Sequence, residues 1–413
     1  MRRLAWVTRQ GSSIVPAFQT GTRPVPNVQP VKQQVRIVRV TPEHSGVLAE
    51  FFRKVWSPGA SADSVRVARA ADAAANPAVH GGDTPTYVFM RGEDALGYVT
   101  TIPIRLWISG SERIAYWVKG LMVLPEHRSG PIGVLLTKEL MRWHHPLLAS
   151  TVPVPAGRLF EALGFRSYGS FPTAIRILDA GEVLRRLDPL ALGLGGSSWI
   201  AGKVVRLIQR THLSGPAGQC ARLGAATLTV VAAPSTRALN LTIGDEPGVA
   251  DMDRLWAGIR NTITAGAVRD AASLMYRYSA AGQAPYTPIV VREHGGSLAG
   301  MAYVKHPRRD DDPRLRGLHV ATLSDIVCDA RRKDVMSALL AGAERAARDL
   351  GGHALMSSAT VTGLFRVQRE RAWMPLPATL HFYAHDPNAD LKTASDLGQW
   401  WLTRGDGGSD GGL

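Results

Sequence analysis

The chain has 413 residues, of which 45% are hydrophobic and 20% charged, and this composition excludes a wholly disordered protein. Its two cysteines, Cys220 and Cys328, are too few for a disulfide framework and lack the spacing of a zinc ribbon. No uncharged apolar run approaches the roughly 20 residues that span a bilayer. Half of the net charge of +14 comes from the first 42 residues, which contain seven Arg and Lys residues and no acid.

Residues 1–34 are rich in Pro, Gly, Gln and Thr and show no periodicity, which predicts a disordered basic tail. No apolar run of 7–15 residues follows Arg2 and Arg3, so a secretory signal is not expected. A solvated tail is favoured over a transit peptide. No basic stripe interleaved with aromatic residues points to nucleic acid as a partner. We therefore expect a soluble, cytoplasmic protein, and its oligomeric state stays open.

The first half of the chain predicts an α/β domain over residues 35–180. A strand at 35–40 is followed by helices at 42–56 and 61–75. Alternating segments at 86–90, 96–107 and 113–124 predict antiparallel strands joined by short turns. A helix at 131–144, a strand at 147–152, a helix at 155–163 and a final strand at 168–178 complete this domain.

The second half repeats this order, which predicts a second domain over residues 226–385. Its predicted elements are helices at 252–259 and 267–278, strands at 288–293, 298–305 and 318–328, a helix at 333–350, a strand at 354–358, a helix at 362–370 and a strand at 378–384. Residues 181–225 are interpreted as a linker with a basic helix near 203–210, and residues 386–413 as a C-terminal tail. The fold class is thus a layered α/β (α+β) arrangement of a duplicated unit.

One segment carries a chemical signal. The hydrophobic stretch Leu121, Met122, Val123 runs into a polar loop and then into the helix predicted from Pro131. The backbone N–H groups at a helix N-terminus are unpaired and the helix dipole adds positive potential, so a diphosphate fits there. The segment lacks the Lys-Ser/Thr pair of a P-loop, and it follows an antiparallel meander rather than the parallel unit of a Rossmann fold.

This segment resembles the acetyl-CoA-binding motif of the GNAT acetyltransferases, in which a strand and a loop lead to Arg/Gln-x-x-Gly-x-Gly/Ala and a helix. Arg128 and Gly133 match the motif, while Pro131 replaces the middle glycine and Gly130 lies one place earlier. Residues 158–165, which end in Gly-Phe, resemble the later helix of the family. The resemblance implies two GNAT-like domains, each a mixed, mostly antiparallel sheet flanked by helices, and acetyl-CoA as co-substrate. The implied contacts are made by Leu121, Met122, Val123, Arg128, Ser129, Gly130, Ile132, Gly133 and Val134.

The second half resembles the same fold more faintly. Arg332 and Ser337 occupy the places of Arg128 and Gly133, but Asp334 replaces Gly130, and a carboxylate there repels a diphosphate. We therefore expect weakened or lost cofactor binding in this half. Residues 269–270 and 274–278 also resemble tandem GNAT proteins associated with bacterial surface-polysaccharide genes.

The resemblance implies direct attack on the thioester by a primary amine, with an amino sugar and an amino acid as the two candidate acceptors. Phe160 stands where the family often has its proton-donating Tyr, so the candidate catalytic residues are Glu126, Tyr168 and Tyr116. Lys119 and His127 are further possible participants. No spacing of His, Cys or acidic residues predicts a metal site.

Two other functions stay open at this point. Fem-type peptidoglycan aminoacyl transferases also have two GNAT-like domains but use charged tRNA, which the basic charge suits. A non-catalytic pair that binds acyl-CoA or holds a partner is the other alternative, and the absence of an acidic residue from 114–123 favours it.

Overall fold

The computed structural model describes residues 34–55, 57–79, 84–150, 152, 154–186, 239–279, 285–309, 315 and 317–408. The predicted N-terminal tail and the helix predicted near 203–210 lie outside these residues, as does Cys220. Within the described part, no helix is long and apolar enough to cross a membrane.

The first half contains the predicted elements in the predicted order, except that the last predicted strand is divided into two and that α5 was not predicted. They are β1 (Val35–Arg39), α1 (Ser45–Val55), α2 (Ala62–Ala75), β2 (Thr86–Arg91), β3 (Asp94–Ile108), β4 (Ser111–Val123), α3 (Ile132–Met141), β5 (Leu147–Ala149), α4 (Val154–Ala162), β6 (Arg166–Ser170), β7 (Thr173–Ile177) and α5 (Ala180–Arg186). Local chemistry fixes several ends. For example, the Ser61 hydroxyl accepts the Ser64 N–H at 3.1 Å and caps α2.

The second half repeats this order with a few additions. It comprises β8 (Leu239–Ile243), α8 (Val249–Ile259), β9 (Ala265–Ala267), α9 (Ala271–Tyr278), β10 (Tyr286–Glu293), β11 (Leu298–Arg309), β12 (His319–Cys328), α10 (Lys333–Asp349), β13 (Ala354–Ser358), α11 (Leu364–Glu370), β14 (Met374–Leu376), β15 (His381–His385) and β16 (Trp400–Trp401). The predicted helix at 267–278 is too long, because Ala267 ends a strand and Asp270 caps a helix that begins at Ala271.

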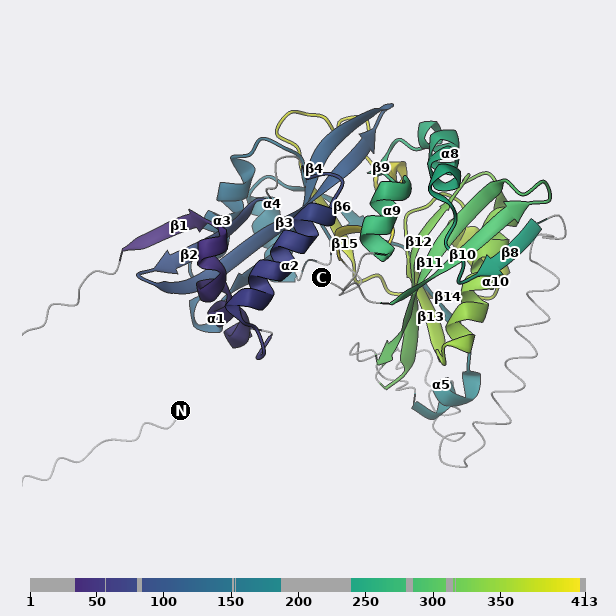
Figure 1. Cartoon of the computed structure of the whole chain (residues 1–413), viewed down its shortest axis with the longest axis horizontal. Helices are drawn as coiled ribbons and strands as arrows, with labels where there is room; N and C mark the ends of the chain where they lie inside the picture. The colour runs from purple at the N-terminus through teal and green to yellow at the C-terminus, as the bar shows by residue number, and fades with distance from the viewer. Residues whose placement is uncertain are drawn as a thin grey trace, which may run out of the picture. The chain divides into compact units, whose positions relative to one another are not determined.

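The two halves exchange strands. The first sheet has the order β1-β2-β3-β4-β5-β15-β6, and the second has β14-β7-β13-β12-β11-β10-β8. β15 therefore lies between β5 and β6 of the first half, and Figure 1 shows it beside β6. The prediction of a single strand at 168–178 is wrong, because Phe171 and Pro172 interrupt it. The two resulting strands, β6 and β7, belong to different sheets.

The C-terminal segment is packed rather than free. Residues 386–408 were expected to form part of a tail, but Leu391, Trp400 and Leu402 are buried, and β16 pairs with β9 in parallel. A short 3-10 turn, η5 (Asp406–Gly408), follows. The aromatic and aliphatic residues of this segment bury apolar surface, which favours its ordering.

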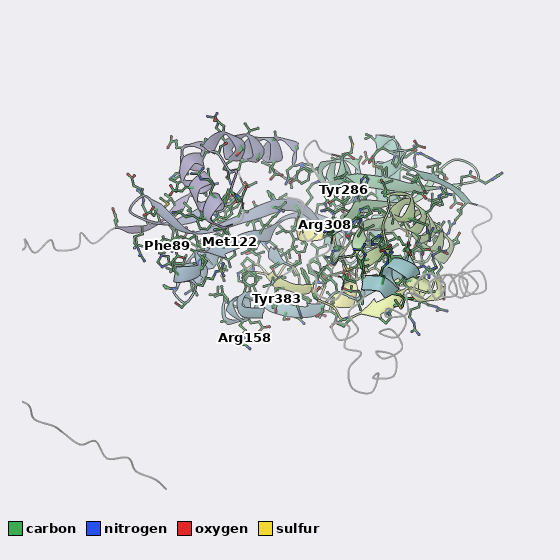
Figure 2. All side chains as sticks on the ribbon, turned by 90° about the horizontal axis from the view of Figure 1, so that it is seen from below. Phe89, Met122, Arg158, Tyr286, Arg308 and Tyr383 are labelled. Carbon is green, nitrogen blue, oxygen red and sulfur yellow. The ribbon has the colours of Figure 1, made fainter. Side chains whose placement is uncertain are left out.

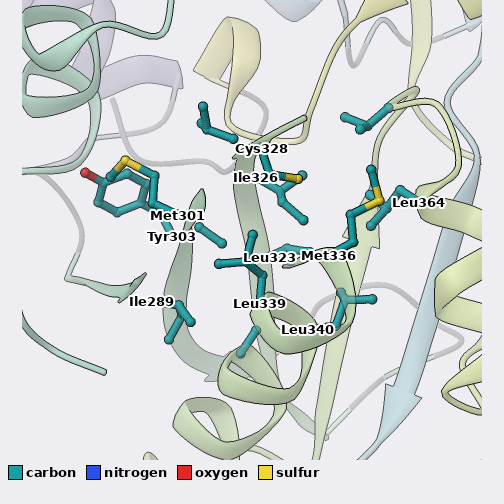
Figure 3. Close-up of a cluster of buried hydrophobic side chains, with 14 of the residues drawn as sticks. Ile289, Met301, Tyr303, Leu323, Ile326, Cys328, Met336, Leu339, Leu340 and Leu364 are labelled. Carbon is teal, nitrogen blue, oxygen red and sulfur yellow. The ribbon is translucent and has the colours of Figure 1, made fainter. Parts of the chain in front are cut away.

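The core of the second half lies between its sheet and α10. Figure 3 shows Leu339 of α10 beside Leu323 of β12, and Leu340 and Ile326 belong to the same buried cluster. Cys328 belongs to this cluster and is fully buried, and burial raises the pKa of its thiol to about 12. The prediction that Cys328 is a small buried residue is confirmed.

Candidate functional site

Two neighbouring parallel strands of the first sheet separate after a short contact. β4 pairs with β5 only at Tyr116–Leu147 and Trp117–Leu148. Beyond Trp117 the strand continues to Val123 with β3 as its partner on the other side. The described structure thus leaves one edge of residues 118–123 without a strand neighbour. Backbone N–H and C=O groups on such an edge are ready to bind a ligand.

The place where β4 and β5 separate, with the open edge of residues 118–123, is called the fork here. A β-bulge lies on β4 within this fork. The register passes from Tyr98–Met122 to Thr100–Lys119, so β4 contains one residue more than β3. Gly120 has φ +65° at the bulge, a conformation that favours glycine, and a Cβ there would lie 3.2 Å from the Tyr98 ring. Bulges of this kind change the direction of neighbouring side chains and backbone groups.

The loop after β4 leads directly into α3. A 3-10 turn, Pro125–His127, is followed by the exposed residues Arg128, Ser129 and Gly130, and Pro131 is the N-cap of α3. Arg128 Nε donates to the carbonyl oxygen of Val123 at 3.1 Å, and none of the described carboxylates pairs with its guanidinium. A positively charged side chain and an open helix N-terminus therefore occur together at the end of the fork.

The predicted cofactor-binding residues all lie on this strand, loop and helix. Leu121, Met122 and Val123 are half-buried at the end of β4, and Met122 is labelled in Figure 2. The Ile132 side chain is buried against Gly97, so it is not available to a ligand. At Gly133 a Cβ would meet Leu159 at 3.5 Å, an ordinary contact, and Val134 follows on the same turn.

The corresponding loop of the second half is neutralised by its own carboxylates. Arg331 pairs with Asp329 at 2.6 Å, and Arg332 pairs with both Asp334 and Glu293 at 2.7 Å. These ion pairs remove the net positive charge that a diphosphate requires.

The chain itself covers the fork of the second half. β12 pairs with β13 only from Val320 to Leu323, and a bulge follows at Ser324. The Ser324 carbonyl oxygen accepts the Gly405 N–H at 2.7 Å, and Thr360 N–H donates to the Leu402 carbonyl oxygen at 2.9 Å. The C-terminal segment thus lies where the first half leaves an open strand edge.

The three predicted catalytic residues lie in three different surroundings. Glu126 is exposed in the 3-10 turn. Tyr116 is buried against the rings of Trp143 and His145, and burial raises its pKa. Tyr168 packs on Phe382 and Trp400, and burial raises its pKa too. The structure does not bring them into one cluster, and their catalytic roles stay predictions.

Two residues stand out that sequence reasoning left aside or missed. Lys119, one residue before the bulge, has its Nζ shielded from solvent with no hydrogen-bond partner among the described residues. Burial lowers the pKa of Lys119 to about 8, Asp72 raises it and Lys305 lowers it. Tyr383 comes from β15, and its Oη would lie 2.5 Å from a Cβ at Gly157 of α4. Figure 2 shows Tyr383 near Arg158 of that helix.

Tyr383 escaped detection because more than 200 residues separate it from α4, and only the strand exchange brings them together. Its ring centroid is 6.2 Å from that of Phe160, the residue that replaces the expected Tyr. A phenol therefore does lie beside this helix, although it comes from the other half of the chain.

A network of buried charges holds the halves and the C-terminal segment together. Arg269 Nε donates to Asp325 at 3.0 Å and its Nη2 to Asp406 at 2.7 Å, and all three side chains are inaccessible to solvent. Arg105 of β3 pairs with Asp270 at 2.5 Å. Among the described residues, no group of three or more His, Cys, Asp or Glu is arranged to hold a metal ion.

Comparison with known proteins gives similarity of fold only. No family model matches the chain, and no curated protein matches it by sequence. A probable N-acyltransferase of Enterococcus faecalis matches 87% of this chain and 74% of its own, with a TM-score of 0.52 and 11% identity. A GCN5-related N-acetyltransferase of Kribbella flavida matches 89% and 74%, with a TM-score of 0.51 and 13% identity.

The N-myristoyltransferase of Saccharomyces cerevisiae, solved with bound myristoyl-CoA, matches 88% of this chain and 84% of its own, with a TM-score of 0.50 and 12% identity. Each similarity extends over both halves of this chain. The chain therefore has a mixed α/β fold of two helix-flanked sheets, shared with the GNAT acyltransferases.

Proposed function

We propose that this protein is an acyl-CoA-dependent N-acyltransferase that transfers an acyl group, most simply acetyl, to a primary amine. The observation that carries the proposal is the contrast between the two halves. The first half combines an open fork of β4 and β5 with a loop whose Arg128 has no described carboxylate partner. In the second half, Asp329 and Asp334 pair with the arginines of the corresponding loop, and the C-terminal segment covers the corresponding strand edge.

The residues of the first half suit such a co-substrate. Arg128 and the N–H groups of Gly133 and Val134 would bind the diphosphate, and the open edge of Leu121–Val123 would bind the pantetheine amides. When bound, acyl-CoA supplies the acyl group as a thioester, whose carbon–sulfur bond breaks as the amine nitrogen forms the amide.

The remaining chemistry falls to the protein. A backbone N–H on the open edge of β4 is placed to donate to the oxyanion that develops on the carbonyl oxygen. Tyr383 provides a phenol beside α4 that suits donation of a proton to the leaving sulfur. The acceptor nitrogen must lose one proton, and Glu126 is the group proposed to receive it.

Isothermal calorimetry with acetyl-CoA tests the proposal. We expect saturable micromolar binding that Gly133→Glu abolishes, because the added carboxylate repels the diphosphate while its Cβ meets only Leu159. Arg128→Ala should weaken binding about tenfold, the loss of one charge-assisted hydrogen bond. Arg332→Ala is the matched control in the second half and should bind like the wild type.

Thiol release with a panel of primary amines then tests transfer itself. Equal affinity of the wild type and Gly133→Glu would refute the site. Tight binding without thiol release above background for any amine would refute the activity and favour a protein that only binds acyl-CoA.

A further inference from the structure

The C-terminal turn of the chain lies in the angle of the fork, the point where β4 and β5 separate. The last paired residues of the two strands are Trp117 and Leu148, and Ser150 comes directly after β5. A Cβ at Gly407 of η5 would lie 2.9 Å from the Trp117 ring and 2.8 Å from the Ser150 hydroxyl oxygen. The backbone of this turn therefore lies against both arms of the fork.

Trp117 fills the face of the sheet on which this turn lies. Its side chain is 2% exposed, and its ring centroid is 5.9 Å from that of Phe382 of β15. Leu148 and Trp400 belong to the same buried cluster. Protein interiors are close-packed, so aromatic rings buried in this way leave little free space between them. A chain of methylene groups that reached this face would have to displace the ring or the C-terminal turn.

Tyr116 fills the other face at the same level, because consecutive side chains of a strand point to opposite faces. Its ring centroid is 6.1 Å from that of Trp143 and 5.3 Å from that of His145. The Trp143 indole N–H donates to the Tyr87 hydroxyl at 2.5 Å, and the Arg39 Cζ lies 4.7 Å from the centroid of the Trp143 ring. These contacts hold Trp143 in place, so both faces of the sheet are filled where β4 and β5 meet.

The proposed co-substrate directs its acyl group toward this filled angle. Its diphosphate would bind at Arg128 and the start of α3, and its pantetheine amides would bind along the open edge of β4. The thioester would then face the end of that edge at Trp117, since β5 pairs with β4 there. Residues 118–123 span about 20 Å at roughly 3.3 Å per residue, and the extended pantetheine arm occupies most of this length. Only a short acyl group fits between the thioester and the Trp117 ring.

We propose that Trp117 and the C-terminal turn at Gly407 form the floor of the acyl-binding site and restrict the transferred group to a chain of about four carbon atoms or fewer. This assignment rests on the proposed function, since it identifies the class of acyl donor used at the same site. Trp117 is a specificity-determining residue and takes no part in the chemistry. Both halves contribute to this selection, because β4 supplies the ring and the C-terminal segment supplies the turn that lies against it.

Calorimetric titration of the full chain with acyl-CoA thioesters of increasing length tests this floor. The probes are acetyl-CoA, butyryl-CoA and octanoyl-CoA, which have the same diphosphate and the same pantetheine arm. We expect acetyl-CoA and butyryl-CoA to bind the wild type within about threefold of each other. Octanoyl-CoA should bind at least tenfold more weakly than acetyl-CoA, because its chain meets the Trp117 ring and moves the thioester away from the open edge.

Substitution of Trp117 should change which thioester is preferred. Trp117→Val enlarges the floor and should raise the affinity for octanoyl-CoA, relative to that for acetyl-CoA, at least tenfold. Trp256→Val is the matched control and should keep the wild-type ratio. Trp256 of α8 is 3% exposed and, like Trp117, has an indole N–H with no hydrogen-bond partner among the described residues. Trp117→Phe removes less volume and should shift the ratio in the same direction, which keeps the test decisive if the Val variant fails to fold.

The wild type alone can overturn the assignment, which would fail if octanoyl-CoA bound as tightly as acetyl-CoA. A folded Trp117 variant with the wild-type ratio of the two affinities would count equally against it. Thiol release with one primary amine should fall in the same order, from acetyl-CoA to octanoyl-CoA, and the reverse order would contradict a floor at Trp117. If none of the thioesters binds, the proposed function itself is refuted, and this result is distinct from binding that ignores chain length.

Discussion

Asp406 offers a sharp test of how the C-terminal segment is held. Its Oδ2 accepts hydrogen bonds from Arg269 Nη2 at 2.7 Å and from the Thr403 N–H at 2.8 Å, and its Oδ1 accepts one from Arg277 at 3.0 Å. Burial raises the pKa of Asp406, but Arg269 and Arg277 lower it more, so the pKa lies below its usual value. The carboxylate is thus charged and paired in the folded protein.

We expect Asp406→Asn to lower the free energy of unfolding by about 3 kcal/mol. Removing one partner of a buried ion pair costs about 3–5 kcal/mol, and Asp325 still compensates part of the Arg269 charge, which places the cost at the lower end. Urea unfolding at pH 7, followed by tryptophan fluorescence, measures this loss. Asp63→Asn, which breaks the exposed pair with Arg66, is the control and should leave the midpoint unchanged.

The same residue predicts a response to acid. A carboxyl group whose pKa is depressed in the folded state contributes stability above its unfolded pKa of about 4, and this contribution disappears as the pH falls through the folded pKa. The difference between the wild type and Asp406→Asn should therefore be full at pH 7 and shrink below pH 4. A variant with the wild-type urea midpoint at pH 7 would refute the assignment of Asp406 as the anchor of this segment.

Two further substitutions test the packing and charge of the interior. The pKa of Lys119 is about 8 in the folded protein and 10.5 in the unfolded chain, so between these pH values the unfolded chain binds one proton more. The free energy of unfolding of the wild type should therefore rise over pH 8–10 by at most about 3 kcal/mol. Lys119→Met removes this rise and should be at least as stable as the wild type at pH 7, and lower stability there would contradict an unpaired ammonium. Gly342→Val places a Cβ 2.5 Å from Ile289 and 2.8 Å from Leu241, and overpacking should cost about 1–3 kcal/mol in urea unfolding. Gly258→Ala, in an open position of α8, is its control and should be neutral or slightly stabilising.

The order of the elements could be predicted because their signals are local. Alternation over residues 96–107 and 113–124, the glycine turns and the proline before α3 all act within a few residues, and the helices and strands follow them closely. The strand exchange could not be predicted, because alternation says that a strand exists and not which sheet receives it. Only Pro172, which cannot donate an N–H to a ladder, marks the place where β6 and β7 part.

The C-terminal segment shows how composition can mislead. The sequence interpretation makes residues 386–413 a C-terminal tail, and its last ten residues contain five glycines, but two of these glycines are required by close contacts. A Cβ at Gly405 would lie 2.1 Å from the Tyr278 hydroxyl and 2.9 Å from the Ser324 carbonyl oxygen, and Gly407 adopts φ +70°. Glycine is needed here because the backbone itself lies in a crowded interior that has no room for a Cβ atom. A glycine-rich composition usually indicates a solvated chain, and here it does not.

Only part of the candidate site could be predicted from the sequence. The loop around Arg128 is a contiguous motif, so the sequence displays it whole. The surroundings of Lys119 are assembled from Asp72, Lys305 and Tyr276, which belong to three elements in both halves. No spacing rule connects such residues, and only the folded sheets bring their charges together.

The strand exchange also constrains how the two halves have come to differ. β15 supplies Tyr383 to the first half, and the C-terminal turn reaches β4 through Gly407. In the second half, residues 402–405 cover the corresponding strand edge. The loop of the second half agrees with the proposed loss of diphosphate binding, because Arg331 and Arg332 are paired internally. The proposed site thus draws on both halves, although one half alone carries the motif that predicts it.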